Sequence, residues 1–435
     1  MTLRPVAANA LIGFGGRRWT AATLALAAAV CVVAVLLAIA RGQREGVGGD
    51  FHVFWQAGRN FATGAPLYHG DLPGARRFIY PPFAAMVFQV LAIFPLRLAA
   101  EVFSCINLVL LGVATYLTRS IVARTPPGQT VEALPLVLAL VLSLVFHLEN
   151  LNHVQVNEVI FVLILLGIDA HLRALDVRAA GYFVAATALK ITPVFFVIWL
   201  ILRGRRRAAL AVPPLAIACV VAPLLMRGPA TGAAELAEYY HSFLQGFQHG
   251  QVLTDQRVQN LGALVYRMMR PAETPEHLQY GYLPASERAT ALTYEAGAAS
   301  LLLLFLVNLG LLRARGAAPS ALELSTVFLI SHLLSPITWK AHLVTLLFVF
   351  YTFLRLRPAV LPAPLRVVLI GLWALIGLSG LSGRDLVGRD AYYYLGGYSV
   401  VVWTMLLLFV AAVVLAEREA SALRPAVVPA DLRLR

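Results

Sequence analysis

The charged residues at the borders of long apolar segments are the part of this sequence best suited to chemistry. Asp50 follows the first such segment in the stretch GGDFHVFW, and His52 comes two residues later. A carboxylate is costly to keep at a membrane boundary, so an acid in this position is by default a functional-site candidate. A helix N-cap or a solvated loop acid are the structural alternatives for Asp50.

The two lysines are the second chemical signal. Lysine accounts for only two of the 35 basic residues, and both Lys190 and Lys340 lie in broken, otherwise apolar segments. A lysine at the centre of a membrane helix costs about 2.5–3.5 kcal/mol on insertion scales, so two such placements suggest a bound anion or a water-filled site. The structural alternative is that each side chain snorkels to the interface.

Composition defines the class of protein that must position these groups. Of the 435 residues, 60% are hydrophobic and 13% are charged, which is typical of a polytopic membrane protein and excludes a soluble domain. The net charge of +13 comes largely from arginines in short loops, so it indicates membrane topology and not nucleic acid binding. Cys31, Cys105 and Cys219 lie far apart in apolar runs and are interpreted as packing residues, without disulfide or metal spacing.

The arginine clusters predict the topology if all of them face the cytoplasm. They are Arg17-Arg18, Arg119 and Arg124, Arg173 and Arg178, Arg203 with Arg205 to Arg207, Arg313 and Arg315, and Arg355 and Arg357. We then expect an all-α bundle of about 12 transmembrane helices, near residues 20–40, 99–118, 133–148, 154–172, 179–190, 192–202, 208–226, 291–312, 320–336, 340–356, 362–382 and 397–416. This single domain, residues 20–416, would lie between cytoplasmic tails at residues 1–19 and 417–435.

Two longer connections are expected on the outer side. The first outer loop, residues 41–98, contains the apolar stretch from Pro81 to Leu96, which cannot be a full crossing in this topology. We expect it to form juxtamembrane helices in the outer interface, interrupted by Pro95. Residues 227–290 form the second long outer loop.

The spans at residues 179–190 and 192–202 are only about eleven residues each, whereas a bilayer asks for roughly 20. They meet at Lys190-Ile191-Thr192-Pro193. Backbone broken at membrane depth is tolerated where it is buried in protein or lines a watery cavity, so we expect a hydrated pocket on the outer side. The alternative is one continuous helix, kinked at Pro193, that carries a buried lysine.

This topology brings the unusual polar groups to the outer side of the membrane. Those singled out as candidates are Asp50, His52, Tyr80, Gln155, Asn157, Glu158, Lys190, Gln259, Asn260, Arg267, Lys340 and His342. His147, His171 and His332 lie near span ends without partners in the sequence, and we interpret them as structural.

Several short motifs, taken in order, resemble glycosyltransferase family 87 of the GT-C superfamily of integral membrane transferases. They are Asp50 after the first helix, Phe78-Ile79-Tyr80-Pro81-Pro82, the polar turn through Gln155 and Asn157, Ala188-Leu189-Lys190-Ile191-Thr192-Pro193 followed by the cluster from Arg203 to Arg207, and Ser335-Pro336-Ile337-Thr338-Trp339. The resemblance covers about residues 48–357.

The resemblance implies a GT-C-like fold and a hexosyltransferase, mannose being the expected sugar, that uses a polyprenyl-phosphate sugar outside the membrane. In that superfamily the acid at the start of the first outer loop is the catalytic base, and Asp50 occupies the matching position. The chain departs from the family pattern after Trp339, where an acid and two histidines are expected and Lys340-Ala341-His342 is found.

The chemistry that fits this resemblance is attack by an acceptor hydroxyl on the anomeric carbon, with inversion, and with Asp50 as general base. Lys190, Lys340, His342 and Arg267 are candidates for stabilising the departing lipid phosphate, which needs neither a metal nor another cofactor. The other candidates would bind substrate: His52, Tyr80, Gln155, Asn157, Glu158, Gln259 and Asn260.

A transporter or flippase for an anionic lipid or solute is the alternative function, since discontinuous helices are typical of transporters. The absence of a convincing internal repeat and the long aromatic loop after the first helix favour the transferase. A transferase fold that has lost activity is a third interpretation, raised by Lys340-Ala341. The expected partners are the lipid-linked donor, a glycolipid or glycan acceptor and membrane lipids, for a multi-pass protein of the cytoplasmic membrane whose active site faces outside.

Overall fold

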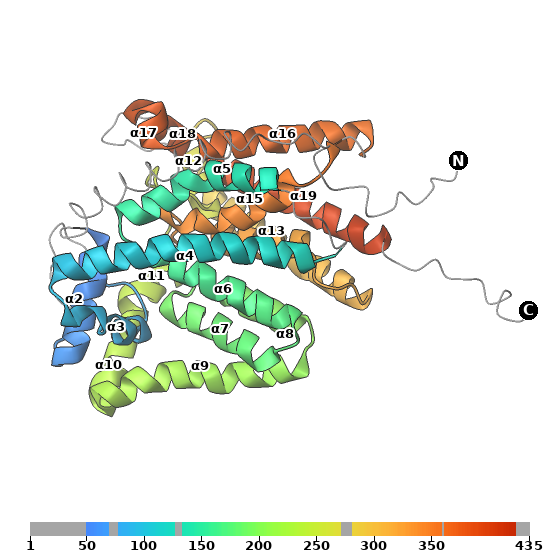
Figure 1. Cartoon of the computed structure of the whole chain (residues 1–435). Helices are drawn as coiled ribbons and strands as arrows, with labels where there is room; N and C mark the ends of the chain where they lie inside the picture. The colour runs from blue at the N-terminus through green and yellow to red at the C-terminus, as the bar shows by residue number, and fades with distance from the viewer. Residues whose placement is uncertain (1–48, 69–76, 127–132, 271–280, 359–360, 423–435) are drawn as a thin grey trace, which may run out of the picture.

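The computed structural model describes residues 49–68, 77–126, 133–270, 281–358 and 361–422, and these residues fold into a bundle of α-helices (Figure 1). Six of the described helices are long and apolar enough to cross a bilayer. They are α4 (Leu96–Arg124), α5 (Ala133–Asn152), α9 (Arg206–Arg227), α13 (Glu287–Ala314), α16 (Ala363–Gly380) and α19 (Val400–Ala422). The chain is therefore a helical membrane protein, as the sequence predicts. The predicted first helix, residues 20–40, and the tail at residues 1–19 lie outside the described residues.

The other predicted spans are helices that are shorter than these six. The described residues therefore do not contain the full set of about twelve crossings that the sequence predicts. They are α6 (Asn157–Leu172), α7 (Asp176–Leu189), α8 (Val194–Leu202), α14 (Ala321–Leu333), and the 3-10 helix η4 (Lys340–Thr345) continued by α15 (Leu346–Leu354). Each is interrupted at a polar segment, next to Gln155, Lys190 or Ser335. The helices are short because polar residues break them where the candidate residues lie.

The break at Lys190 confirms the predicted pair of short helices. Lys190 has an extended backbone, with φ −157° and ψ 125°, and α8 begins only after Pro193. Proline disfavours a helical conformation in the residue before it, so the chain leaves the helix at this point. The alternative of one continuous kinked helix is wrong. Helices α4, α6, α7 and α9 pack in sequence beside one another (Figure 1).

The predicted outer segments form short helices at one end of the bundle. The first loop contains α2 (Asp50–Thr63), α3 (Pro82–Phe88) and η2 (Leu91–Ile93), and Pro95 caps α4. The second contains α10 (Pro229–Tyr239), the π-helix η3 (Tyr240–Leu244), α11 (Gln245–Gln248) and α12 (Leu261–Met269). Helices α17 (Arg384–Val387) and α18 (Arg389–Gly397) precede α19. We call the end that holds α2, α3 and α10 the site end (Figure 1).

Helix α2, which begins at Asp50, is packed tightly against α3. A Cβ atom at Gly58 would lie 2.5 Å from the backbone carbonyl carbon of Phe88, so only glycine allows this approach. The indole of Trp55 donates a hydrogen bond to the carbonyl oxygen of Phe94 at 2.9 Å. These contacts fix the helix that carries the candidate base.

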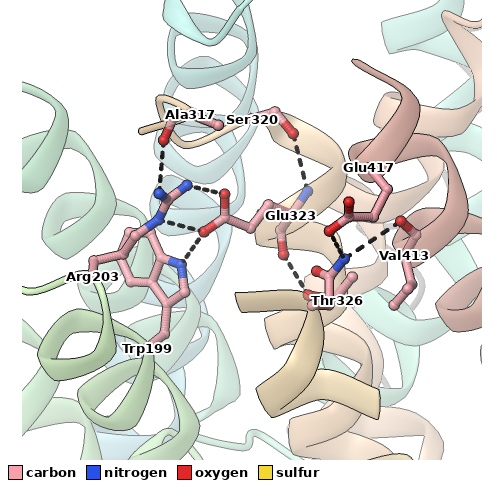
Figure 2. A network of polar contacts seen from close by, with 9 residues as sticks. Trp199, Arg203, Ala317, Ser320, Glu323, Thr326, Val413 and Glu417 are labelled. Atoms are coloured by element: carbon pink, nitrogen blue, oxygen red, sulfur yellow. Dashed lines mark hydrogen bonds and ion pairs between the residues drawn. The ribbon is translucent and has the colours of Figure 1, made fainter. Parts of the chain in front are cut away.

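A buried ion pair between Arg203 and Glu323 joins the end of α8 to α14 (Figure 2). Arg203, from the predicted cytoplasmic cluster, donates to the carboxylate of Glu323 and to the carbonyl oxygen of Ala317, and Trp199 donates to the same carboxylate at 2.7 Å. The exposed fractions of the Arg203 and Glu323 side chains are 7% and 1%. Because a buried charge is costly without a partner, this network ties α8 firmly to α14.

Candidate active site

Asp50 is the first residue of α2, and its carboxylate faces the turn between α5 and α6. Gln155 Nε2 donates a hydrogen bond to Asp50 Oδ2 at 2.6 Å, and His153 Nδ1 lies 3.9 Å from the same oxygen. His153 Nε2 lies 3.5 Å from an oxygen of Glu149. The N-cap position of α2 belongs to Gly49, and the Asp50 side chain is only 18% exposed. Asp50 is thus neither the N-cap nor a fully solvated acid.

The break between α7 and α8 places Lys190 against α6. Lys190 Nζ donates to Asn157 Oδ1 at 2.9 Å and lies 5.9 Å from the ring centroid of Tyr80. Asn157 in turn donates to Asn150 Oδ1 at 3.1 Å and to the carbonyl oxygen of Ala341 at 3.0 Å. One buried asparagine therefore connects the cation to α5 and η4.

Two small cavities meet at Lys190 and His342. The first, about 40 Å³, is also lined by Tyr80, Pro81 and Tyr239. The second, about 30 Å³, shares Lys190, Thr192 and His342 with the first and is also lined by Asn157, His332 and Thr345. Each has room for a water molecule. The structure brings Tyr80, Asn157, Lys190 and His342 together, as the topology predicts.

The orientation of His342 is fixed by its own helix. His342 Nδ1 accepts a hydrogen bond from the backbone N–H of Trp339 at 3.2 Å, so this nitrogen is unprotonated and the second nitrogen carries the proton of the neutral ring. His332, interpreted from the sequence as structural, lines the second cavity, and its Nε2 lies 2.6 Å from Thr345 Oγ1. In the sequence, the position of His332 three residues before Ser335-Pro336 is the only local indication that it lies near the cavity.

A larger apolar groove adjoins the first cavity. It has a volume of about 310 Å³ between α3, α7, α8, α9 and α10, and Pro81 and Tyr239 line both the groove and the Lys190 cavity. Sequence reasoning did not predict this groove, because its walls come from five helices that are separate in the chain. We call it the apolar groove below.

Lys340 points away from these cavities. Its Nζ donates to the carbonyl oxygen of Ser382 and lies 4.2 Å from the ring centroid of Tyr392, and its side chain is buried. Lys340 therefore holds η4 against the segment from Ser382 to α18. The two lysines that the sequence groups together have different surroundings.

Three other candidates hold the second outer segment in place. Asn260 caps α12 and donates to the carbonyl oxygen of Ser335 at 2.8 Å, while the backbone N–H of Gln259 donates to the carbonyl oxygen of Thr338 at 2.6 Å. Arg267 donates to the carbonyl oxygens of Asp255 and Val258, both at 2.8 Å. The bonds of Asn260 and Gln259 hold the segment against the turn before Trp339, part of which lines the first cavity, whereas the bonds of Arg267 lie within the segment.

Glu158 and His52 lie outside the cavity walls. Glu158 pairs with His147 Nδ1 between α5 and α6, and both side chains are buried, so His147 has a structural partner that the sequence did not reveal. The ring of His52 packs 6.1 Å from that of Trp55, and burial lowers the pKa of His52. The pKa of Tyr80 is raised by burial and by the Asp50 carboxylate, so its hydroxyl stays protonated near Asp50.

An acid, a lysine, a histidine and an apolar groove at one end of a membrane bundle could serve a reaction on a lipid-linked substrate. The sequence profile of glycosyltransferase family 87 matches residues 78–336, and the chain belongs to this family of membrane glycosyltransferases. This confirms the resemblance of the motifs and favours a transferase over a transporter. The matched region begins after Asp50, so the role of Asp50 as a base stays a prediction.

A mannosyltransferase is among the proteins that are similar to this chain. The chain is 29% identical over 321 residues to the polyprenol-phosphate-mannose-dependent alpha-(1-2)-phosphatidylinositol mannoside mannosyltransferase of Mycolicibacterium smegmatis. The aligned region covers 68% of this chain and 68% of the relative.

Proposed function

We propose that this protein transfers mannose from a polyprenyl-phosphate donor to a glycolipid or glycan acceptor at the outer face of the cytoplasmic membrane. The observation that carries the proposal is the position of Lys190, which lines a cavity next to the apolar groove and interacts electrostatically with the Asp50 carboxylate. Lys190 lines the first cavity, whose walls Pro81 and Tyr239 continue into the groove. A lipid phosphate requires this combination of a cation and an adjoining apolar surface.

The donor fits with its phosphate at Lys190 and His342 and its isoprenoid chain in the apolar groove. Lys190 supplies a charged donor, and the ring of His342 lines the same cavity. The groove is lined almost entirely by apolar side chains, such as Val184, Val197 and Val220. The mannosyl group would then be at the end of the phosphate nearest to Asp50.

The proposed reaction is a single displacement. The acceptor hydroxyl oxygen bonds to the anomeric carbon, the bond from that carbon to the phosphate oxygen breaks, and the polyprenyl phosphate leaves with the electron pair. Asp50 takes the hydroxyl proton as general base, and the configuration at the anomeric carbon is inverted. Lys190 and His342 stabilise the charge that develops on the phosphate. The departing phosphate is already a competent leaving group, so no metal cofactor is part of the proposal.

Transfer by the protein in sealed proteoliposomes tests this function. Radiolabelled polyprenyl-phosphate-mannose in the bilayer, or GDP-mannose outside it, would be offered with lipid extract from the host as acceptor. We expect label to move from the lipid donor alone, and only for molecules whose site end faces the acceptor. Transfer from GDP-mannose, or no consumption of the lipid donor, would overturn the proposal.

A further inference from the structure

Gln155 holds the candidate base through a hydrogen bond that spans 105 positions of the sequence. We propose that Gln155 is a positioning residue, which fixes the Asp50 carboxylate in the orientation required for proton abstraction. This inference rests on the proposed function. It changes the role expected for Gln155 from substrate binding to the alignment of another side chain.

The bond between the two side chains is short and shielded. Gln155 Nε2 and Asp50 Oδ2 are 2.6 Å apart, and Gln155 is 4% exposed. A hydrogen bond to an ionised acceptor is stronger than one between neutral groups, and low exposure strengthens it further. The amide can therefore restrain the carboxylate at the first residue of α2.

The turn that carries Gln155 has an unusual backbone. Val154 has φ 48° and is fully buried, which is an outlier for a β-branched residue. Such a conformation persists only where the surroundings fix it, and here Gln155 N donates to the carbonyl oxygen of Asn150 at 2.9 Å. The left-handed residue lies between His153 and Gln155, and both of these side chains reach Asp50 Oδ2.

A second buried amide anchors the turn from α4. Asn107 Nδ2 donates to the carbonyl oxygen of Gln155 at 3.1 Å, and Asn107 is fully buried in the middle of α4. A polar side chain is costly in such a place unless it is bonded. Asn107 bonds to Gln155, and Gln155 bonds to Asp50, so these contacts link α4, the turn and α2. The bond to Gln155 also compensates for the burial of the Asn107 amide.

The bond has a consequence for the rate of transfer. A hydrogen bond that holds the carboxylate in one orientation keeps it aimed at the acceptor hydroxyl, so removal of the amide should lower kcat and leave donor binding nearly unchanged. His153, which also lies near Asp50 Oδ2, is unchanged in the variants described next.

The test compares Gln155→Met, which keeps the length of the side chain but removes the amide, with Gln155→Glu, which adds a negative charge. Gln248→Met, at an exposed position of α11, is the control. For Gln155→Met we expect kcat to fall about 10- to 100-fold, with the KM for donor nearly unchanged. Gln155→Glu should lower kcat at least as much, because an ionised carboxylate accepts hydrogen bonds and donates none.

A thermal double-mutant cycle of Gln155→Met and Asp50→Asn supplies a readout that is independent of activity. The two changes in Tm should be clearly non-additive, because they remove the same bond. Additive changes in Tm with an unchanged kcat, or a rise in KM alone, would overturn this inference while transfer by the wild type continues. Failure of the wild type to transfer would instead overturn the proposed function, and this inference with it.

Discussion

Lys190 donates a hydrogen bond from Nζ to Asn157 Oδ1 at 2.9 Å, which joins the break between α7 and α8 to the first turn of α6. The amide neutralises none of the lysine charge. It orients the cation, while Asn157 is itself held by Ala341 and Asn150. Because its partner is neutral, Lys190 keeps a net charge with which to bind a phosphate.

Asn157→Asp is therefore expected to weaken donor binding. The added carboxylate would pair with Lys190 and repel the phosphate, raising the Kd for donor about tenfold or more. Asn60→Asp, at the partly exposed side of α2, is the control. Binding of a fluorescent polyprenyl phosphate to protein in nanodiscs measures the effect. An unchanged Kd in Asn157→Asp would remove Lys190 from the phosphate site.

The two lysines should differ when each is replaced by methionine. Lys190→Met is expected to lower donor affinity and kcat by about tenfold or more each, because the phosphate loses a charge-assisted bond. Lys340→Met removes the contacts with Ser382 and Tyr392, so we expect a lower Tm with a nearly unchanged donor Kd. Thermal unfolding and donor binding of both variants check this. Equal losses of donor affinity would show that the lysines act together.

The apolar groove gives a prediction that depends on donor chain length. Cys219→Trp fills the groove from α9, whereas Ile217→Trp places the same side chain on an exposed part of that helix. We expect Cys219→Trp to raise the KM for a long-chain donor about tenfold, because apolar surface of the chain is no longer buried. A donor with one or two isoprene units should be affected much less. The same KM for both donors would place the isoprenoid chain elsewhere.

The buried pair of Arg203 and Glu323 should dominate stability at its end of the bundle. Glu323→Gln leaves the guanidinium without its charged partner, at a cost of about 3–5 kcal/mol in the free energy of unfolding. Glu101→Gln breaks an exposed pair with Arg97 on α4 and should cost less than about 1 kcal/mol. Denaturant unfolding in bicelles compares the two. Similar small losses would mean that the Arg203–Glu323 network contributes little.

The sequence predicted those parts of the site that depend on local chemistry. Pro193 and the short apolar runs beside Lys190 indicated the broken pair of helices, because proline and length are local properties. Lys190, Asn157 and His342 lie together because the helices that carry them are interrupted at the same end of the bundle. Asp50 and Gln155 lie at such interruptions too, although no pattern in the sequence pairs them.

Other features depend on distant partners and could not be read from the chain. Asn260 and Arg267 are polar residues of an outer loop in the sequence, but the carbonyl groups of Ser335 and Val258 decide that they are bonded within the fold. Lys340 resembles Lys190 in its sequence context, and only the fold shows that Lys340 donates to the carbonyl oxygen of Ser382. The predicted span at residues 154–172 began three residues too early, because hydropathy does not register the turn from which α6 starts at Asn157.

Single-turnover transfer from a preformed complex with polyprenyl-phosphate-mannose is the most direct test of Asp50 as the base. Wild type and Asp50→Asn would be loaded with labelled donor in nanodiscs, mixed with acceptor and quenched over time, with Asp390→Asn on exposed α18 as control. We predict that Asp50→Asn binds donor normally and transfers about 100- to 10,000-fold more slowly. Transfer by Asp50→Asn at the wild-type rate would contradict the account.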